Sequence, residues 1–359
     1  MTEPTKTAFH RKLEAMGAAE FSEDGGWLWF ASLGDEMKEY NAVRKDVGVW
    51  DLSPLVKWDF SGPDSVKAAN WVNTNDISGM KVGQVRYGPF LNASGGVVDD
   101  GTVYKLADDH LFVMTNGEGH ADYWAENLRQ FDVKVKNVAR EMPHLAIQGP
   151  RSREVVSALT DADVAGLKYF NFIPEKITLG GCTGYLARTG FSGELGYEFF
   201  TSPDQADKLW DEVVGANNLT PFGVTAIYML RLEAGLLIQG DDYDAEETNP
   251  FDCGLGRFVH MDKDFLGKAA IAGIAADPPN DYKTLQMGSQ PEDGAVVKAD
   301  DKDVGVVRCS IESPEFGWIA GARLARSVAI DGNQVEVDGA EAIVQPWGIY
   351  DPEKKKPRS

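Results

Sequence analysis

The chain has 359 residues, a formal net charge of −21 and 43% hydrophobic residues. This length exceeds what one hydrophobic core usually holds and predicts two or three domains. The acidic charge excludes nucleic acid as a partner, because phosphates require a basic surface, and it disfavours anionic membranes.

The first fifty residues alternate helical and aromatic segments. Trp27 and Trp29 stand two residues apart on an expected strand and therefore share a face, which suits either a core or a platform for a ligand. The expected helices cover residues 9–16 and 34–47, and the expected strands cover residues 25–30 and 48–53.

Residues 56–139 follow the order β-α-β-β-β-α-β, which predicts an antiparallel sheet with helices on one face. At its centre, two runs of β-forming residues between Tyr87 and Tyr104 flank an Asn-Ala-Ser-Gly-Gly break, a pattern typical of a β-hairpin. His120 falls in the first turn of a later helix, where we expect a surface residue.

Two adjacent carboxylates, Asp99 and Asp100, begin the returning strand of this hairpin. Neighbours on a strand point to opposite faces, so we expect one carboxylate in water and the other inside. Tyr104 shares the face of Asp100. A buried carboxylate beside a phenol needs a reason, because an unpaired buried charge is costly. The alternative is a turn with two solvated aspartates.

A second unit, after residue 144, repeats a similar order of strands and helices. Its most informative block, residues 184–200, reads strand, glycine-rich turn, strand, with Glu198 at an otherwise apolar strand centre. This glutamate is either paired with a cation or holds a ligand that offers donors. A following helix, expected to be capped by Thr220, carries Arg231 and Glu233, and either charge would serve the neighbourhood of Glu198.

The last segment changes character after a linker at 275–281. Short β runs separated by Gly, Asp and Pro predict a small all-β barrel or jelly roll, followed by a frayed tail at 354–358. We therefore divide the chain into 1–276, with an inserted unit at roughly 56–140, and 277–359.

The three cysteines lack metal-ligand spacing, so no metal is expected. No membrane span or signal region is evident, which favours the cytoplasm.

Short motifs occur in order between residues 8 and 352. They are Asn75-Asp-Ile77, Gly95-Gly-Val-Val-Asp-Asp100, Leu145-Ala-Ile-Gln-Gly-Pro150, Arg188-Thr-Gly-Phe-Ser-Gly-Glu194, Gly196-Tyr-Glu198, Leu230-Arg-Leu-Glu-Ala-Gly235 and Lys263-Asp-Phe-Leu-Gly-Lys268. Each is weak alone, but as an ordered set they resemble the glycine-cleavage T-protein (aminomethyltransferase) family.

This resemblance implies an α+β ring of three domains, with two antiparallel-sheet units, a C-terminal β-barrel and tetrahydrofolate in the central channel. It makes Asp100 the catalytic carboxylate and Glu198 the residue that reads the N–H donors of the pterin through charge-assisted hydrogen bonds. The remaining candidates for the folate site are Tyr87, Tyr104, Phe191 and Arg231.

The chain departs from the family pattern on the substrate side, where Ala226-Ile-Tyr228 replaces Ala-Arg-Asp. An apolar pocket with Trp27, Trp29, Tyr228 and Trp347 would suit a small apolar donor. We therefore predict a transferase that moves a methyl or methylene group to tetrahydrofolate from a small molecule, namely an aromatic ether, methylenedioxy, sulfonium or N-methyl compound. A carrier protein is then an unlikely partner.

Two alternatives remain. One is the glycine-cleavage aminomethyltransferase itself, which acts on an aminomethyl-lipoyl carrier protein. The other is a non-catalytic folate-binding relative that assists iron–sulfur proteins. That branch is marked by Lys-Gly-Cys-Tyr-x-Gly-Gln-Glu, whereas this chain has Asp252-Cys-Gly-Leu-Gly-Arg257 in the corresponding region.

Overall fold

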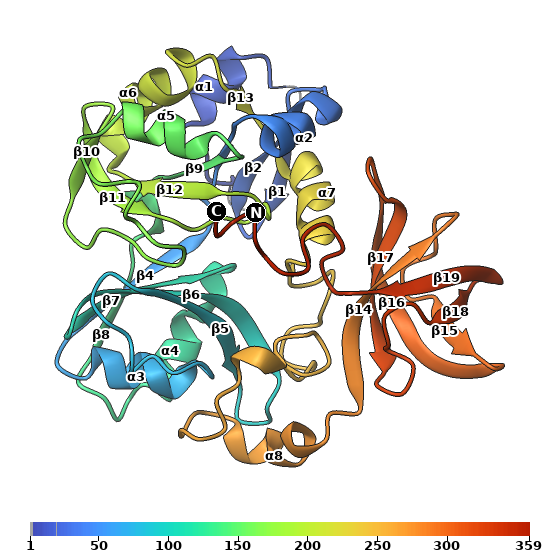
Figure 1. Cartoon of the computed structure of the whole chain (residues 1–359). Helices are drawn as coiled ribbons and strands as arrows, with labels where there is room; N and C mark the ends of the chain where they lie inside the picture. Colours follow the sequence, from blue (N-terminus) through green and yellow to red (C-terminus); the bar gives the residue numbers. More distant parts are fainter. Residues whose placement is uncertain (1–2, 19) are drawn as a thin grey trace.

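The structure is a computed structural model that describes residues 3–18 and 20–359. A six-stranded sheet, a five-stranded sheet and a closed barrel are arranged around a common centre (Figure 1). This arrangement confirms the predicted α+β class with a C-terminal barrel. Among the described helices, none is long and apolar enough to cross a membrane.

The six-stranded sheet has the order β10-β11-β12-β9-β3-β13, and all its pairs are antiparallel except β13 with β3. Its strands β9 and β12 are buried at every residue, because helices cover one face and the centre of the molecule lies on the other (Figure 1). The strands are β3 (Gly48–Asp51), β9 (His144–Gln148), β10 (Ile177–Leu179), β11 (Cys182–Ala187), β12 (Gly196–Phe200) and β13 (Thr220–Pro221). The N-terminal hairpin and the nearby helices are β1 (Glu20–Asp24), β2 (Trp27–Ser32), α1 (His10–Ala15), α2 (Glu36–Lys45), α5 (Ser152–Ala158) and α6 (Ala206–Trp210).

The five-stranded sheet has the order β5-β6-β7-β4-β8 and is antiparallel throughout, as predicted. Trp124 packs edge-on against Phe60 and Phe90, with ring centroids 5.3 and 5.5 Å apart, and so fixes its helix to the sheet. The elements are β4 (Val56–Ser61), β5 (Val85–Leu91), β6 (Val97–Ala107), β7 (His110–Thr115), β8 (Lys134–Asn137), α3 (Ser65–Val72) and α4 (Ala121–Asn127).

The barrel closes in the order β14-β17-β16-β15-β18-β19. Alternating Val, Leu and Ala side chains point inward and form a separate core, and closure leaves no free strand edge. Its strands are β14 (Asn280–Met287), β15 (Val296–Ala299), β16 (Lys302–Ser313), β17 (Gly317–Ala325), β18 (Gln334–Val337) and β19 (Ala340–Gln345).

The connecting segments differ from the sequence-based expectations in two places. Thr220 pairs with β3 instead of capping a helix, so α7 (Val224–Ala234) begins after Gly223. Helix α8 (Lys268–Ala276) takes up part of the expected linker, because its alanine-rich sequence has high helix propensity.

The C-terminal segment is held in place, so the expectation of a frayed tail is wrong. Lys354 donates to the carbonyl of Ala234, one of the last carbonyls of α7 that lack a partner within the helix. The side chains of Arg153 and Arg188 both donate to the carbonyl of Ser359. Basic residues thus bring the segment into the centre of the molecule, close to β12 (Figure 1).

Candidate active site

Asp100 lies on β6 with a carboxylate held by two phenols. The hydroxyl of Tyr87, from the neighbouring strand β5, donates to Oδ2 at 2.6 Å. The hydroxyl of Tyr243, from the loop after α7, donates to Oδ1. Only 6% of Asp100 is exposed, so these hydroxyls replace the water that would otherwise solvate the carboxylate.

The surroundings of Asp100 favour its protonated form. Burial raises the pKa of Asp100 to about 7, and the neighbouring charge of Asp99 adds to this effect, while the phenols of Tyr243 and Tyr87 oppose it. A carboxyl group with a pKa near 7 both takes and gives a proton close to neutral pH, as general acid–base chemistry requires.

Asp99 is also buried, so the expectation that one of the two carboxylates faces water is wrong. Asp99 is 1% exposed, because β6 is an inner strand whose other face is covered by the segment that leads into α4. His120 of that segment contacts Asp99 Oδ2 through Nε2 at 2.6 Å, and its side chain is only 14% exposed. His120 is therefore not a free surface residue.

Glu198, on β12, faces the strand that carries Asp100. The Tyr104 hydroxyl donates to Glu198 Oε2 at 3.2 Å, and the Thr189 hydroxyl donates to the same oxygen. Because Tyr104 and Asp100 both belong to β6, this contact joins the five-stranded sheet to the six-stranded sheet. The candidate site therefore lies where the inner faces of the two sheets meet.

The charge of Glu198 is supported by hydrogen bonds. Burial opposes its ionisation, but the adjacent His144 and the hydroxyls of Thr189 and Tyr104 hold its pKa below the ordinary value. His144 Nε2 lies 3.5 Å away, and burial lowers the pKa of His144 to about 4, so this ring is neutral at pH 7. Among the described residues, no Arg or Lys forms an ion pair with Glu198, which favours the ligand-holding alternative.

Arg231 does not contact Glu198. Its guanidinium is 1% exposed and binds Asp242 at 2.5 Å and Asp241 at 3.3 Å. Glu233 instead binds Arg44 of α2 at 2.7 Å. The expectation that one of these two charges serves the neighbourhood of Glu198 is therefore wrong, because each has a buried partner of its own.

The aromatic candidates for the substrate side lie in different clusters. Trp29, Phe191 and Tyr228 border one cluster around α7, and Trp29 also packs against the cluster that contains Trp27. Trp27 belongs to the core of the five-stranded sheet and donates through Nε1 to a glutamate. Trp347 packs on the barrel side. The structure thus does not bring the four predicted substrate residues, Trp27, Trp29, Tyr228 and Trp347, into one cluster.

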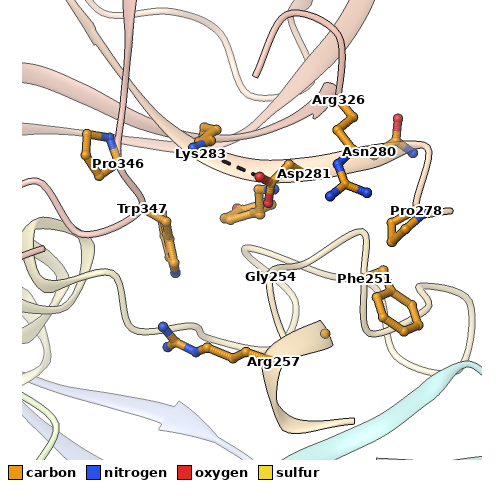
Figure 2. Close-up of a pocket in the computed structure, with 12 residues that line it drawn as sticks. Phe251, Gly254, Arg257, Pro278, Asn280, Asp281, Lys283, Arg326, Pro346 and Trp347 are labelled. Atoms are coloured by element: carbon orange, nitrogen blue, oxygen red, sulfur yellow. Dashed lines mark hydrogen bonds and ion pairs between the residues drawn. The ribbon is translucent and has the colours of Figure 1, made fainter. Parts of the chain in front are cut away.

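Trp347 lines a cavity of about 330 Å³ between the start of β14 and residues 251–257. Figure 2 shows Trp347 and Arg257 pointing toward one another from opposite sides of this cavity. Tyr282 supports the tryptophan in an edge-to-face contact, with ring centroids 4.7 Å apart.

Comparison with known proteins gives the chain a family. The model of the GCVT N-terminal domain matches residues 9–263. An aminomethyltransferase from Saccharopolyspora erythraea is 34% identical over 352 residues, which cover 94% of this chain and 95% of that protein. The protein belongs to the glycine-cleavage T-protein family. An aminomethyltransferase from Thermotoga neapolitana is 32% identical, with 92% of this chain and 93% of that protein covered.

A solved structure agrees with this family at the level of the fold. The glycine cleavage system aminomethyltransferase T from Bartonella henselae superposes with a TM-score of 0.85 at 24% identity, and the match covers 96% of this chain and 98% of that one. Family membership confirms the recognition from motifs and the predicted enzyme class, a tetrahydrofolate-dependent transferase of one-carbon units.

The same comparisons correct two predictions. The prediction of a demethylase that acts on a small molecule is wrong, because the full-length relatives are aminomethyltransferases. The expectation that a carrier protein is an unlikely partner is wrong for the same reason, since the glycine-cleavage aminomethyltransferase takes its group from a carrier. Ala226, Ile227 and Tyr228 lie on α7, where Ala226 and Ile227 belong to the hydrophobic cluster around that helix and Tyr228 packs against it.

Several residues of the site were not found by sequence reasoning. Tyr243 lies 143 residues from Asp100 in the sequence, and no local sequence pattern predicts a contact between them. His144 sits at the start of a buried strand, and its position beside Glu198 depends on the pairing of β9 with β12. His120 was noticed, but its spacing from Asp99 gives no sign of their contact.

Proposed function

We propose that this protein is the aminomethyltransferase of a glycine-cleavage system. It would transfer the one-carbon unit of an aminomethyl-lipoyl carrier protein to tetrahydrofolate, with release of ammonia. The observation that supports this most is the extent of the relationship, because aminomethyltransferases at 32–34% identity align over nearly the whole chain. The buried carboxylates Asp100 on β6 and Glu198, which is bound by Tyr104 of the same strand β6, supply a site that suits this chemistry.

The described residues fit tetrahydrofolate. The contacts to Glu198 from Thr189, Tyr104 and His144 are all to Oε2, which leaves Oε1 for the donors of a ligand among the residues that the structure describes. A carboxylate in this position would hold the amino-pyrimidinone edge of the pterin. When bound, tetrahydrofolate would supply the amine that accepts the one-carbon unit.

Asp100 would move the protons of the transfer. Its ionised carboxylate takes a proton at the reacting centre, and with a pKa of about 7 the same carboxyl can then give it up to a leaving group. The hydroxyls of Tyr87 and Tyr243 would hold both oxygens in place through this exchange. Such a proton transfer is typically worth about 10²–10⁴ in rate.

We also propose that residues 1–276 carry the folate site and that residues 277–359 form a barrel that closes one side of it. Trp347, Phe191 and the cavity near Arg257 would then lie along the approach of the substrates rather than at the reacting carbon.

The test is a direct assay of the purified protein with a lipoyl carrier charged with an aminomethyl group. The proposal predicts ammonia release that depends on both the carrier and tetrahydrofolate. A parallel screen with methoxy-aromatic, sulfonium and N-methyl donors should give no turnover. The proposal fails if the charged carrier is inert while the protein binds tetrahydrofolate.

A further inference from the structure

The carboxylate of Asp99 is bound by four donors that surround the peptide of Asp100. Its Oδ1 accepts the backbone N–H of Asp100 at 2.8 Å and the side-chain amide of Asn116 at 2.6 Å. Its Oδ2 accepts the backbone N–H of Asn116 at 2.9 Å and contacts His120 Nε2 at 2.6 Å. Since an ionised carboxylate only accepts hydrogen bonds, the ring nitrogen is the donor. The Asn116 side chain also donates to the backbone carbonyl of Asp100 at 3.3 Å.

His120 connects this buried group to solvent. Asp99 has a 1% exposed side chain, whereas that of His120 is 14% exposed, so the ring lies between the buried carboxylate and solvent. Edge-to-face contacts with Tyr123 and Trp124, at centroid distances of 6.4 and 6.2 Å, fix the plane of the ring. The imidazole is thus held in its orientation toward Asp99.

The charges around Asp100 differ in how they are balanced. Asp242 is paired with the guanidinium of Arg231 at 2.5 Å, a partner that stays charged at all ordinary pH values. Asp99 is paired with an imidazole, which carries a positive charge only in its protonated form. Burial raises the pKa values of the phenols and the thiol nearby, which therefore stay neutral. The titratable groups whose charge or hydrogen bonds act on Asp100 are Asp99 on β6, Tyr87 on β5, and Tyr243, Asp242 and Cys253 from the segments after α7.

We propose that His120 is a positioning residue for Asp100 that acts through Asp99. Its hydrogen bond to Asp99 helps to fix the peptide that carries Asp100. A protonated imidazole in this position balances the charge of Asp99, so that Asp100 ionises more readily, and without that balance the negative charge of Asp99 acts on Asp100 in full. This inference rests on the proposed function for its consequence in catalysis, but the electrostatic link between the three residues does not depend on it.

The test compares His120→Gln with Asp99→Asn. Glutamine keeps a neutral donor but cannot carry a positive charge, so the proposal predicts that the pH midpoint for ionisation of Asp100 moves upward by about one unit. Asn at position 99 removes the opposing negative charge, so the midpoint should move downward. The acid limb of kcat/KM for ammonia release should follow the same two directions, because the ionised form of Asp100 starts the transfer.

The control is His110→Gln. His110 forms a similar contact, 3.2 Å from Asp59, on the same sheet, and neither residue contacts Asp100. Carboxyl carbon-13 NMR of the full chain, with the Asp100 signal assigned by its loss in Asp100→Asn, reports the midpoint without any assay of activity. If the charged carrier proves inert, the proposed function fails while the NMR titration still tests this inference.

A His120→Gln protein with an unmoved midpoint and a uniform loss of activity at every pH would show that His120 is merely structural. An equal shift in His110→Gln would overturn the inference as well. If His120→Gln does not fold, His120→Asn, which also cannot carry the positive charge of an imidazolium, takes its place, and an unmoved midpoint in that variant rejects the proposal.

Discussion

The hydroxyl oxygen of Tyr87 lies 2.6 Å from Oδ2 of Asp100, across the antiparallel pair β5–β6. Tyr87 pairs in register with Thr102, two residues from Asp100, so the phenol reaches the carboxylate diagonally across the two strands. A phenol in this position stabilises the ionised form of the carboxylate, because a hydroxyl donates more strongly to a charged acceptor than to a neutral one.

Replacement of Tyr87 by Phe removes this donor and leaves the ring. We expect the pKa of Asp100 to rise by about one unit, since a hydrogen bond to a charged group contributes roughly 1.5–3 kcal/mol. The pH profile of ammonia release should show this as a higher midpoint of the acid limb. Tyr185→Phe is a suitable control, because Tyr185 lies on β11 away from Asp100. An unchanged midpoint in Tyr87→Phe would mean that the phenol does not tune Asp100.

Asp100 should also make stability depend on pH. Its pKa rises from 3.8 in the ordinary state to about 7 in the folded protein, so the folded state holds a proton that the unfolded chain releases between these values. The resulting stabilisation is fully present below about pH 4 and is lost as the pH rises through about 7. In Asp100→Asn, the free energy of unfolding should fall less between pH 5 and pH 8 than in the wild type. This expectation would be contradicted if the free energy of unfolding, measured by urea denaturation, changed equally with pH in the wild type and in Asp100→Asn.

Glu198 should govern affinity for folate rather than turnover. In Glu198→Gln the charge is lost and the shape is retained, so tetrahydrofolate should bind roughly 10- to 100-fold more weakly, the range expected for one charge-assisted hydrogen bond. Titration calorimetry measures this directly. Glu175→Gln, an exposed residue of the same unit, should bind normally. Equal affinity in Glu198→Gln and the wild type would place the pterin elsewhere.

The buried pair of Arg44 and Glu233 should make the fold sensitive to the loss of either partner. Arg44 also donates to Glu194 at 3.2 Å, and the hydroxyl of Ser313 on the barrel side donates to Glu233 at 2.6 Å, so the group connects α2, α7 and the end of β16. Loss of one partner leaves an unpaired buried charge, and Arg44→Ala should cost about 3–5 kcal/mol in urea denaturation.

An exposed arginine provides the control for that measurement. Arg151 forms surface ion pairs with Asp46 and Glu154, and more than half of its side chain is in water. Because such pairs are screened by solvent, Arg151→Ala should change the midpoint little. If Arg44→Ala and Arg151→Ala lost similar free energies of unfolding, burial would not explain the cost of breaking the Arg44 pair.

Sequence reasoning located the elements that carry strong local patterns. The hairpin with Asp100 and the strand with Glu198 follow from glycine-rich turns between β-forming runs, and both lie where expected. Thr220 did not behave as a helix cap, because a bridge to β3 competes with capping at that residue. Burial of Asp99 was not predictable from alternation along β6, since the cover on its second face comes from the segment before α4.

The contacts that complete the site depend on tertiary structure. The motif made Arg231 a reasonable candidate for the folate site. In the structure, however, its guanidinium forms a fully buried ion pair with Asp242 from the next loop. Similarly, the residues near Tyr228 suggested a new substrate, although the relatives that align over nearly the whole chain are aminomethyltransferases. Motifs therefore identified the family, while the pairing of buried charges required coordinates.

The most direct test of the account is a single-turnover measurement of ammonia release from an aminomethylated lipoyl carrier at saturating tetrahydrofolate, with wild type and Asp100→Asn in parallel. We predict rapid release by the wild type and release at least about 10²-fold slower in Asp100→Asn, with tetrahydrofolate bound equally well by both. Equal rates in the two proteins, or no release by a wild-type protein that binds tetrahydrofolate, would contradict the central role given to Asp100.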